Sequence, residues 1–141
     1  MKIFGEPEPD KHYPHRPGAY GILFDKDRIA VVEEYGKFFL PGGGIEESED
    51  PEAALRREFL EETGLHPQTV HFMCQTGEYL NMLNGKHFFI ISNFFYATAY
   101  QIMGPPAEEG HKLIWKDPQS AISSLLRPGQ RWAVKEALSY K

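Results

Sequence analysis

The sequence predicts an α/β fold in which a mixed β-sheet carries helices on both faces. Two observations favour it. Short runs of apolar and β-branched residues, separated by turn-forming residues, occupy much of the chain, as expected for β-strands. Helix-forming segments interrupt these runs once in the middle and again at the end. This irregular order indicates an α/β sandwich and not a regular βαβ series.

The first third of the chain contains three expected strands. Residues 1–17 predict an irregular lead-in, because they hold four prolines and many charged side chains, and a single domain is expected over residues 18–141. Apolar runs at 19–24 and 28–34 predict two strands joined by a tight polar turn, and a third short strand is expected at 37–40. The proline and three glycines that follow end the third strand.

A helix is predicted over residues 51–63, and both of its ends are marked. Asp50 can accept hydrogen bonds from the free amides of the first turn, and Pro51 suits the first helical position. The segment that follows is rich in alanine, leucine, arginine and glutamate, which are strong helix formers. Gly64 is a typical stop.

The second half begins with an expected hairpin. Two long strands are predicted at 69–80 and 86–100, and Asn84-Gly85 between them is a strong signal for a two-residue turn. Glycine and two prolines at 104–106 break the pattern. One strand and two helices are expected after the break, at 111–115, 119–126 and 130–140.

Length and composition exclude several protein classes. A chain of 141 residues can bury a core without disulfides or a structural metal, and the single cysteine, Cys74, fits a reducing compartment. No apolar run approaches the roughly 18 residues of a membrane helix, and the charged, proline-containing start does not resemble a secretion signal. We therefore expect a cytoplasmic protein with no membrane partner.

The net charge also limits the partners. With 15 Lys and Arg against 20 Asp and Glu, the formal net charge is −5, so a nucleic acid polymer is disfavoured as the main partner. A small phosphorylated substrate remains compatible with an acidic protein if divalent cations lie between its carboxylates and the phosphates.

Three carboxylates of the predicted helix form an acidic cluster. Glu58, Glu61 and Glu62 stand at positions i, i+3 and i+4 and therefore project from one face. Such neighbours repel one another by a few tenths of a kcal/mol per pair, which a bound cation would relieve. Oxygen ligands of this kind suit hard divalent ions such as Mg²⁺ or Mn²⁺, although a solvated acidic face is the simpler alternative.

The sequence around this cluster decides between the two interpretations. Residues 43–65 read Gly-x5-Glu-x7-Arg-Glu-Phe-Leu-Glu-Glu-Thr-Gly-Leu. Every fixed position of the Nudix box is filled by the expected residue type, so the chain resembles the MutT-like Nudix hydrolases. The resemblance implies a Nudix-type α/β/α sandwich with a mixed central sheet, in which residues 18–141 form a single Nudix hydrolase domain.

The resemblance implies catalytic and structural roles within the box. Glu58, Glu61 and Glu62 would bind the catalytic divalent cations. Arg57 would be held by Glu49 and would orient the cluster without touching the substrate.

Three glycines of the box would have backbone roles. Gly43 and Gly44 would let the loop approach the metal-bound pyrophosphate, with the Gly44 carbonyl as an extra candidate ligand. Gly64 would belong, with Gly43 and Glu49, to the structural part of the motif.

One more carboxylate, from outside the box, typically serves such enzymes as a ligand or as the base that activates water. Glu108 and Glu109 are the candidates. Glu109 is preferred, because it precedes Gly110 and stands six residues before Trp115, an arrangement similar to that of some relatives that cleave nucleoside triphosphates. A solvated turn is the alternative for this acidic pair.

The implied activity is that of a divalent-metal-dependent pyrophosphohydrolase, or pyrophosphatase. It would cleave a nucleoside diphosphate linked to another moiety, with water attacking phosphorus, while cations neutralise the phosphate oxygens and a carboxylate takes the proton. The box does not identify the substrate. The acidic charge disfavours RNA ends, so a small nucleotide, such as a nucleoside triphosphate or a dinucleoside polyphosphate, is preferred.

Other functions and residues remain open. A non-catalytic Nudix-fold nucleotide sensor is the main alternative, and an isoprenoid diphosphate isomerase would need a catalytic cysteine, for which Cys74 is a poor candidate. Tyr79 and Phe38 are weak candidates for substrate contact, and the six histidines are expected to be structural. A homodimer is a candidate assembly, because dimers are common among similar proteins.

Overall fold

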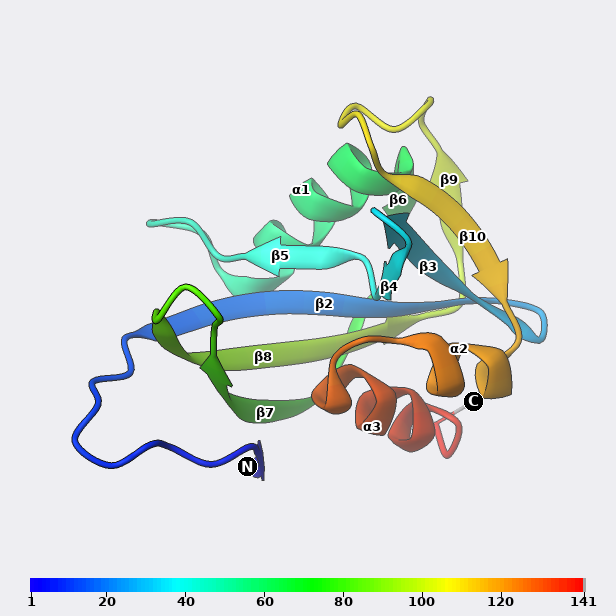
Figure 1. Ribbon diagram of the computed structural model, residues 1–141. Helices are drawn as coiled ribbons and strands as arrows, with labels where there is room; N and C mark the ends of the chain where they lie inside the picture. Colours follow the sequence, from blue (N-terminus) through cyan, green and yellow to red (C-terminus); the bar gives the residue numbers. More distant parts are fainter. Residues whose placement is uncertain (141) are drawn as a thin grey trace.

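A computed structural model describes residues 1–140 (Figure 1), and within this range three helices pack on a mixed β-sheet. The helices are α1 (Pro51–Thr63), α2 (Pro118–Ser124) and α3 (Pro128–Ala137). The strands are β1 (Lys2–Phe4), β2 (His15–Asp25), β3 (Arg28–Glu34), β4 (Lys37–Phe39), β5 (Gly42–Gly44), β6 (Leu65–Pro67), β7 (His71–Asn81), β8 (His87–Ala97), β9 (Tyr100–Ile102) and β10 (Lys112–Lys116). No helix in this part of the chain has the length and apolar character needed to span a membrane.

The central sheet contains both parallel and antiparallel neighbours. Its strand order is β1-β7-β8-β2-β3-β10, with β4 paired to β3 and β5 paired to β2, while β6 and β9 form a separate pair. β1 runs parallel to β7 and β2 runs parallel to β8, whereas the other pairings in this sheet are antiparallel. The predicted mixed sheet is confirmed.

The sheet divides between β2 and β3. These strands pair only beside their connecting turn, at Phe24 with Ile29 and Asp25 with Arg28. Earlier in β2, residues 18–20 pair instead with β5. The sheet therefore opens along β2, and side chains of β2 and β3 that do not pair can line a space between them.

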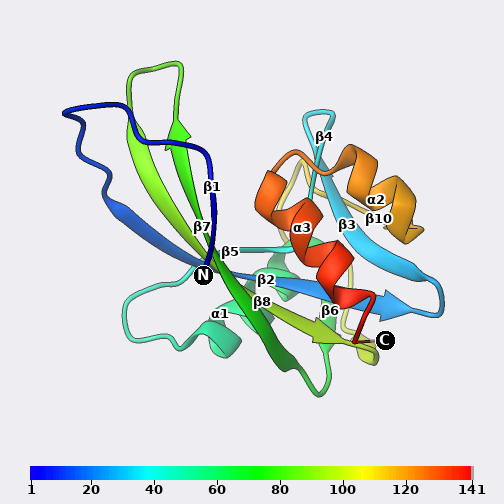
Figure 2. The same ribbon diagram turned by 90° about the horizontal axis from the view of Figure 1, so that it is seen from below.

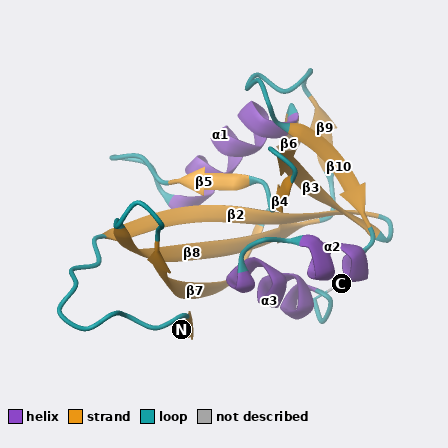
Figure 3. Cartoon of the chain, in the orientation of Figure 1, coloured by secondary structure: helices purple, strands orange, loops and turns teal. Residues whose placement is uncertain are grey.

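Two apolar cores lie on opposite faces of the sheet, between its strands and the helices drawn in purple in Figure 3. The alternation of side chains along β2 sends Ile22 to one face, where it packs with Val134 of α3, and Leu23 to the other, where it packs with Leu55 of α1. α1 thus covers one face, and α2 and α3 cover the other. This layering confirms the predicted α/β/α sandwich.

The expectation of an irregular lead-in over residues 1–17 is wrong at both ends. β1 adds to the edge of the sheet beside β7 (Figure 2), where Phe4 pairs with Glu78, and β2 already begins at His15. The proline-rich stretch lies between these strands, where the Tyr13 hydroxyl donates a hydrogen bond to the Asn81 side chain. A free strand edge supplies backbone hydrogen bonds to any extended segment, so pairing here needs no apolar pattern.

The other elements differ from the expectation mainly at their ends. α1 matches both predicted bounds, and the hairpin of β7 and β8 around Asn84-Gly85 is confirmed. The expected strand 86–100 ends at Ala97, and a separate β9 follows. β5, β6 and β9 were not predicted, because these three-residue strands lack the apolar run that marked β4.

Candidate active site

The strand before α1 approaches the helix closely at Gly43. Pairing of β5 with β2 holds Gly43 so near Glu58 that a Cβ on the glycine would lie 2.6 Å from the Glu58 Cδ. α1 begins where the Asp50 carboxylate accepts a hydrogen bond from the Ala53 N–H at 2.8 Å. The backbone of β5 and the first turns of α1 together fix the position of Glu58.

Arg57 connects the loop to the helix. Its Nε and Nη2 atoms donate hydrogen bonds to the two carboxylate oxygens of Glu49, at 2.7 and 2.9 Å. It also donates to the Gly44 carbonyl oxygen and to Glu58 Oε1, each at 3.0 Å. The hydrogen bonds from Arg57 are the main reason that the pKa of Glu49 falls to about 2. Arg57 therefore holds the loop, including the predicted ligand carbonyl of Gly44, against the acidic side chains.

The carboxylates gather in two overlapping groups. Glu58, Glu61 and Glu108 can each offer an oxygen within 4.8 Å of the others, and Glu62, Glu108 and His111 form a second group of the same kind. Glu108 belongs to both. The three helix glutamates predicted to act together thus share one region with the loop that follows β9.

That loop is held by the C-terminal end of α1. Gly64 ends the helix with a left-handed conformation (φ 74°), and a Cβ there would collide with the Gly104 carbonyl oxygen. The N–H groups of Ala107 and Glu108 both donate to the Glu61 carbonyl oxygen, at 2.9 and 3.0 Å. These contacts place the side chain of Glu108 beside the helix carboxylates.

The structure places Glu108, and not the preferred Glu109, beside the helix carboxylates. Glu109 is exposed and belongs to neither carboxylate group, whereas Glu108 joins both. The physical reason is the hydrogen bond from the Glu108 N–H to the end of α1, which the sequence does not reveal.

Glu62 is the most enclosed of the helix carboxylates, with 13% of its side chain exposed. Its Oε1 accepts a hydrogen bond from the Gly42 N–H at 2.8 Å. Burial, reinforced by the nearby charges of Glu58 and Glu108, raises the pKa of Glu62 to about 8. An ionised Glu62 is therefore costly here unless positive charge is close.

His111 is a member of the site that sequence reasoning missed. Its Nε2 lies 2.6 Å from Glu34 Oε2 and 3.7 Å from Glu62 Oε2, and its Nδ1 lies 3.0 Å from Glu108 Oε2. Only 13% of the side chain is exposed. His111 bridges β3, α1 and the loop, and no spacing in the sequence indicates this meeting of three elements.

The donors of this site fit a hard divalent cation. Carboxylate oxygens from Glu58, Glu61 and Glu108 converge from two elements, and Glu62 with His111 extends the set. Hard cations prefer oxygen ligands, and burial raises the pKa of Glu58, so positive charge nearby would stabilise its ionised form.

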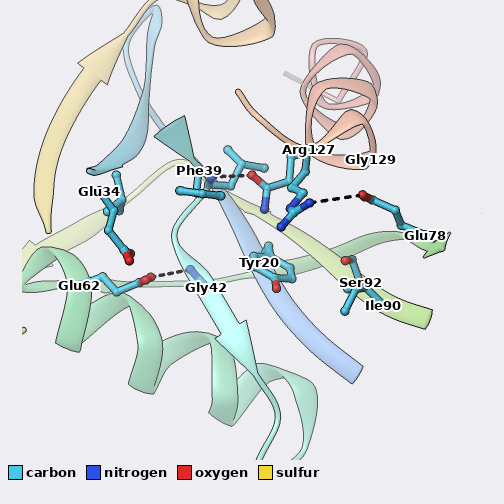
Figure 4. Close-up of a pocket in the computed structure, with 13 residues that line it drawn as sticks. Tyr20, Glu34, Phe39, Gly42, Glu62, Glu78, Ile90, Ser92, Arg127 and Gly129 are labelled. Carbon is cyan, nitrogen blue, oxygen red and sulfur yellow. Dashed lines mark hydrogen bonds and ion pairs between the residues drawn. The ribbon is translucent and has the colours of Figure 1, made fainter. Parts of the chain in front are cut away.

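A pocket of about 260 Å³ adjoins Glu62 (Figure 4). It lies at the opening of the sheet, with Tyr20 of β2 and Val32 of β3 among its walls. Burial raises the pKa of Tyr20 to about 12, so its hydroxyl keeps its proton. The other lining residues include Glu34, Phe39, Leu40, Gly42, Glu78, Ile90, Ser92, Arg127, Gly129 and Gln130.

The two aromatic side chains preferred for substrate contact do not line this pocket. Tyr79 follows Glu78 on β7 and points to the opposite face, where it packs against Tyr13 with ring centroids 5.1 Å apart. The Phe38 ring carries the Lys116 ammonium at 4.2 Å and packs on the core beneath α2. The aromatic walls come from Tyr20 and Phe39 instead.

Comparison with known families agrees with this geometry. A sequence profile of the NUDIX domain matches residues 14–136. The chain belongs to the Nudix family. Members of this family generally use divalent metals, and α1 carries the glutamates of the Nudix box.

Two curated relatives of this Nudix domain differ in the length that they share with it. A CMP-5'-(N-acetyl-N-hydroxy-3-aminopropyl)phosphonate hydrolase from Streptomyces rubellomurinus is 28% identical over 86% of this chain and 61% of its own length. An RNA pyrophosphohydrolase from Roseobacter denitrificans is 44% identical over 52% of this chain and 49% of its own length. The chain therefore spans between about half and three-fifths of these relatives.

Solved structures share the Nudix fold. A mutator MutT protein from Bacillus halodurans superposes with a TM-score of 0.73 at 22% identity, covering 85% of this chain and 80% of its own. A MutT Nudix hydrolase from Burkholderia pseudomallei gives 0.69 at 23% identity, covering 86% and 97%.

Proposed function

We propose that this Nudix domain is a divalent-cation-dependent pyrophosphohydrolase that cleaves a nucleoside diphosphate linked to another moiety. One observation carries the proposal: the acidic cluster of α1 lies directly beside a pocket, and Glu62 belongs to both. A substrate can therefore place a base and sugar in the pocket while its phosphates reach the carboxylates.

Each residue of the cluster has a proposed task. Glu58, Glu61, Glu62 and Glu108 would hold Mg²⁺ or Mn²⁺, with the Gly44 carbonyl as a further candidate. A bound cation would neutralise phosphate oxygens and make a water molecule more acidic. Arg57 would orient Glu58, since the two side chains are hydrogen-bonded.

Glu108 also takes over the role that the sequence assigned to Glu109, as an additional ligand or as the base. Its carboxylate adjoins both acidic groups and is 40% exposed, so it can meet an attacking water and release the proton to solvent. The Gly42 N–H, bonded to Glu62, would keep that carboxylate facing the phosphates.

The names of the two relatives refer to two different substrates. One relative is named for a CMP-linked phosphonate, and the other for RNA. The net charge of −5 opposes binding of a long polyanion, so we propose a small nucleotide as the substrate of a cytoplasmic enzyme. We propose that residues 18–141 supply this activity as one domain, and homodimerisation stays a prediction.

The test is a substrate panel. The protein is incubated with nucleoside triphosphates, dinucleoside polyphosphates and nucleotide sugars, with Mg²⁺, Mn²⁺ or EDTA, and the products are separated by chromatography. Glu62→Gln is the inactive variant, and Glu47→Gln, at an exposed position of the same box, is the matched control. We expect metal-dependent cleavage that only Glu62→Gln loses. Retained nucleotide binding without cleavage of any compound would favour the sensor instead.

A further inference from the structure

The pocket ends in a charged pair on the side away from the acidic cluster. Figure 4 places Glu78 of β7 and Arg127, which precedes α3, across the pocket from Glu62, with Tyr20 between them. This pair has no part in the proposed metal chemistry. Its residues nevertheless line the same cavity, so a ligand whose phosphates lie near Glu62 would place its other end against them.

The Glu78 carboxylate has hydrogen-bonding capacity left over. Only 14% of its side chain is exposed, and the nearest guanidinium atom, Arg127 Nη1, lies 3.8 Å from Oε2, beyond hydrogen-bond range. Burial raises the pKa of Glu78, while the charges of Arg127 and Arg131 act in the opposite direction. Its side chain lines the pocket, so its oxygens can accept a hydrogen bond from a donor that enters there.

Donors lie next to this acceptor. The Gln130 side chain is buried, and its Oε1 accepts a hydrogen bond from the Leu40 N–H at 2.8 Å. That bond uses the amide oxygen, so Nε2 is the donor that this side chain still offers to the pocket it lines. Arg127 supplies guanidinium donors, and Ser92 supplies a hydroxyl. The end of the pocket thus presents one strong acceptor beside several donors.

We propose that Glu78 and Arg127 select the nucleobase of the substrate, favouring a base that has both an exocyclic amino group for Glu78 and a carbonyl oxygen for Arg127, namely cytosine or guanine. The amino group of cytosine would donate to Glu78 while its N3 and O2 accept from Arg127. Guanine would donate from N1 and N2 to Glu78 and accept at O6. The flat apolar walls of Tyr20 and Phe39 would enclose either ring.

Two pairs of substrates test the amino group, and this test rests on the proposed hydrolase function. CTP has an amino group and an acceptor at N3 where UTP has a carbonyl oxygen and an N3–H donor, whereas GTP and ITP differ only by the 2-amino group. We expect kcat/KM for the amino-bearing member of at least one pair to be higher by about 10-fold or more, the discrimination usual for a good base contact. A kcat/KM ratio above one for CTP over UTP indicates cytosine as the selected base, and a ratio above one for GTP over ITP indicates guanine.

Glu78→Gln tests the residue. Its amide can donate as well as accept, so the CTP/UTP or GTP/ITP ratio should fall toward one. Glu136→Gln, an exposed glutamate on α3, should keep the wild-type ratio. A variant that slows both members of a pair equally would overturn the proposal, because the Glu78–Arg127 pair would then be only structural. Thermal unfolding shows whether each variant folds. If Glu78→Gln does not fold, the wild-type protein alone still tests the proposal, which is refuted if its CTP/UTP and GTP/ITP ratios are both close to one.

Binding separates this inference from the function on which it rests. Calorimetric titration with CMP, UMP, GMP and IMP needs no cleavage. If the protein binds CMP more tightly than UMP, or GMP more tightly than IMP, but cleaves no substrate, the selection of the base is supported and the hydrolase function is refuted. Metal-dependent cleavage with equal binding of all four would support the hydrolase and refute the selection of the base.

Discussion

Gly43→Ala tests whether the close contact between β5 and α1 positions the catalytic carboxylates. The new Cβ would lie 2.6 Å from the Glu58 Cδ, whereas carbon atoms pack at about 3.5–4.0 Å. The carboxylate would therefore have to move by about 1 Å. Because Glu58 is the end of a flexible side chain, we expect the fold to survive and kcat/KM to fall by about 100-fold, the usual cost of a misplacement of this size.

Glu47→Ala is the control for a substitution in the same loop. Glu47 is exposed and belongs to neither carboxylate group. The assay compares kcat/KM for the best substrate of the panel, Mn²⁺ affinity by electron paramagnetic resonance, and the thermal midpoint of all three proteins. Wild-type activity in Gly43→Ala, or an equal loss in both variants, would refute the argument that space at Gly43 holds Glu58 in place.

Three further predictions address the carboxylates. Glu61→Gln and Glu62→Gln should each unfold near the wild-type temperature but lower kcat by about 100-fold or more, since a metal ligand acts mainly in the transition state. Near-normal turnover in either variant would refute its assignment as a ligand. Glu108→Gln should reduce kcat/KM more than Glu109→Gln, and the reverse order would return the role to Glu109. In EDTA, the free energy of unfolding should fall between about pH 5 and pH 8, by up to about 1.4 kcal/mol per pH unit. The reason is that Glu62 in the unfolded chain loses its proton near its ordinary pKa, whereas Glu62 in the folded state, with a pKa of about 8, keeps it. Urea midpoints across this range should decline less in Glu62→Gln and in Mn²⁺, and an equal decline in the variant would contradict the origin assigned to it.

The features predicted best from the sequence are those that depend on residues close together in the chain. Asp50, Pro51 and Gly64 mark α1 because capping depends on local backbone groups, and the box spacing placed Glu58, Glu61 and Glu62 on that helix. β5 could not be predicted, since its three glycines carry no side-chain pattern, and it forms through pairing with β2.

The rest of the site depends on contacts between distant segments. His111 meets Glu34 because β10 and β3 are neighbours, and Glu108 reaches the cluster through a hydrogen bond to the end of α1. Tyr79 and Phe38 were chosen by residue type, but strand alternation decides which side chains face a cavity, and the sequence alone does not say which face that is.

The separation of β2 from β3 has an evolutionary consequence. The pocket at this opening brings together two sets of residues from different elements. Those proposed to perform the reaction lie on α1 and the loop after β9, and those proposed to recognise the base lie on β7 and at the start of α3. Glu62 is the residue of the acidic cluster that also lines the pocket. Substitutions at Glu78 or Arg127 can therefore change which compound is bound while the hydrolytic apparatus is inherited intact, so a new specificity can arise by a few changes in one wall.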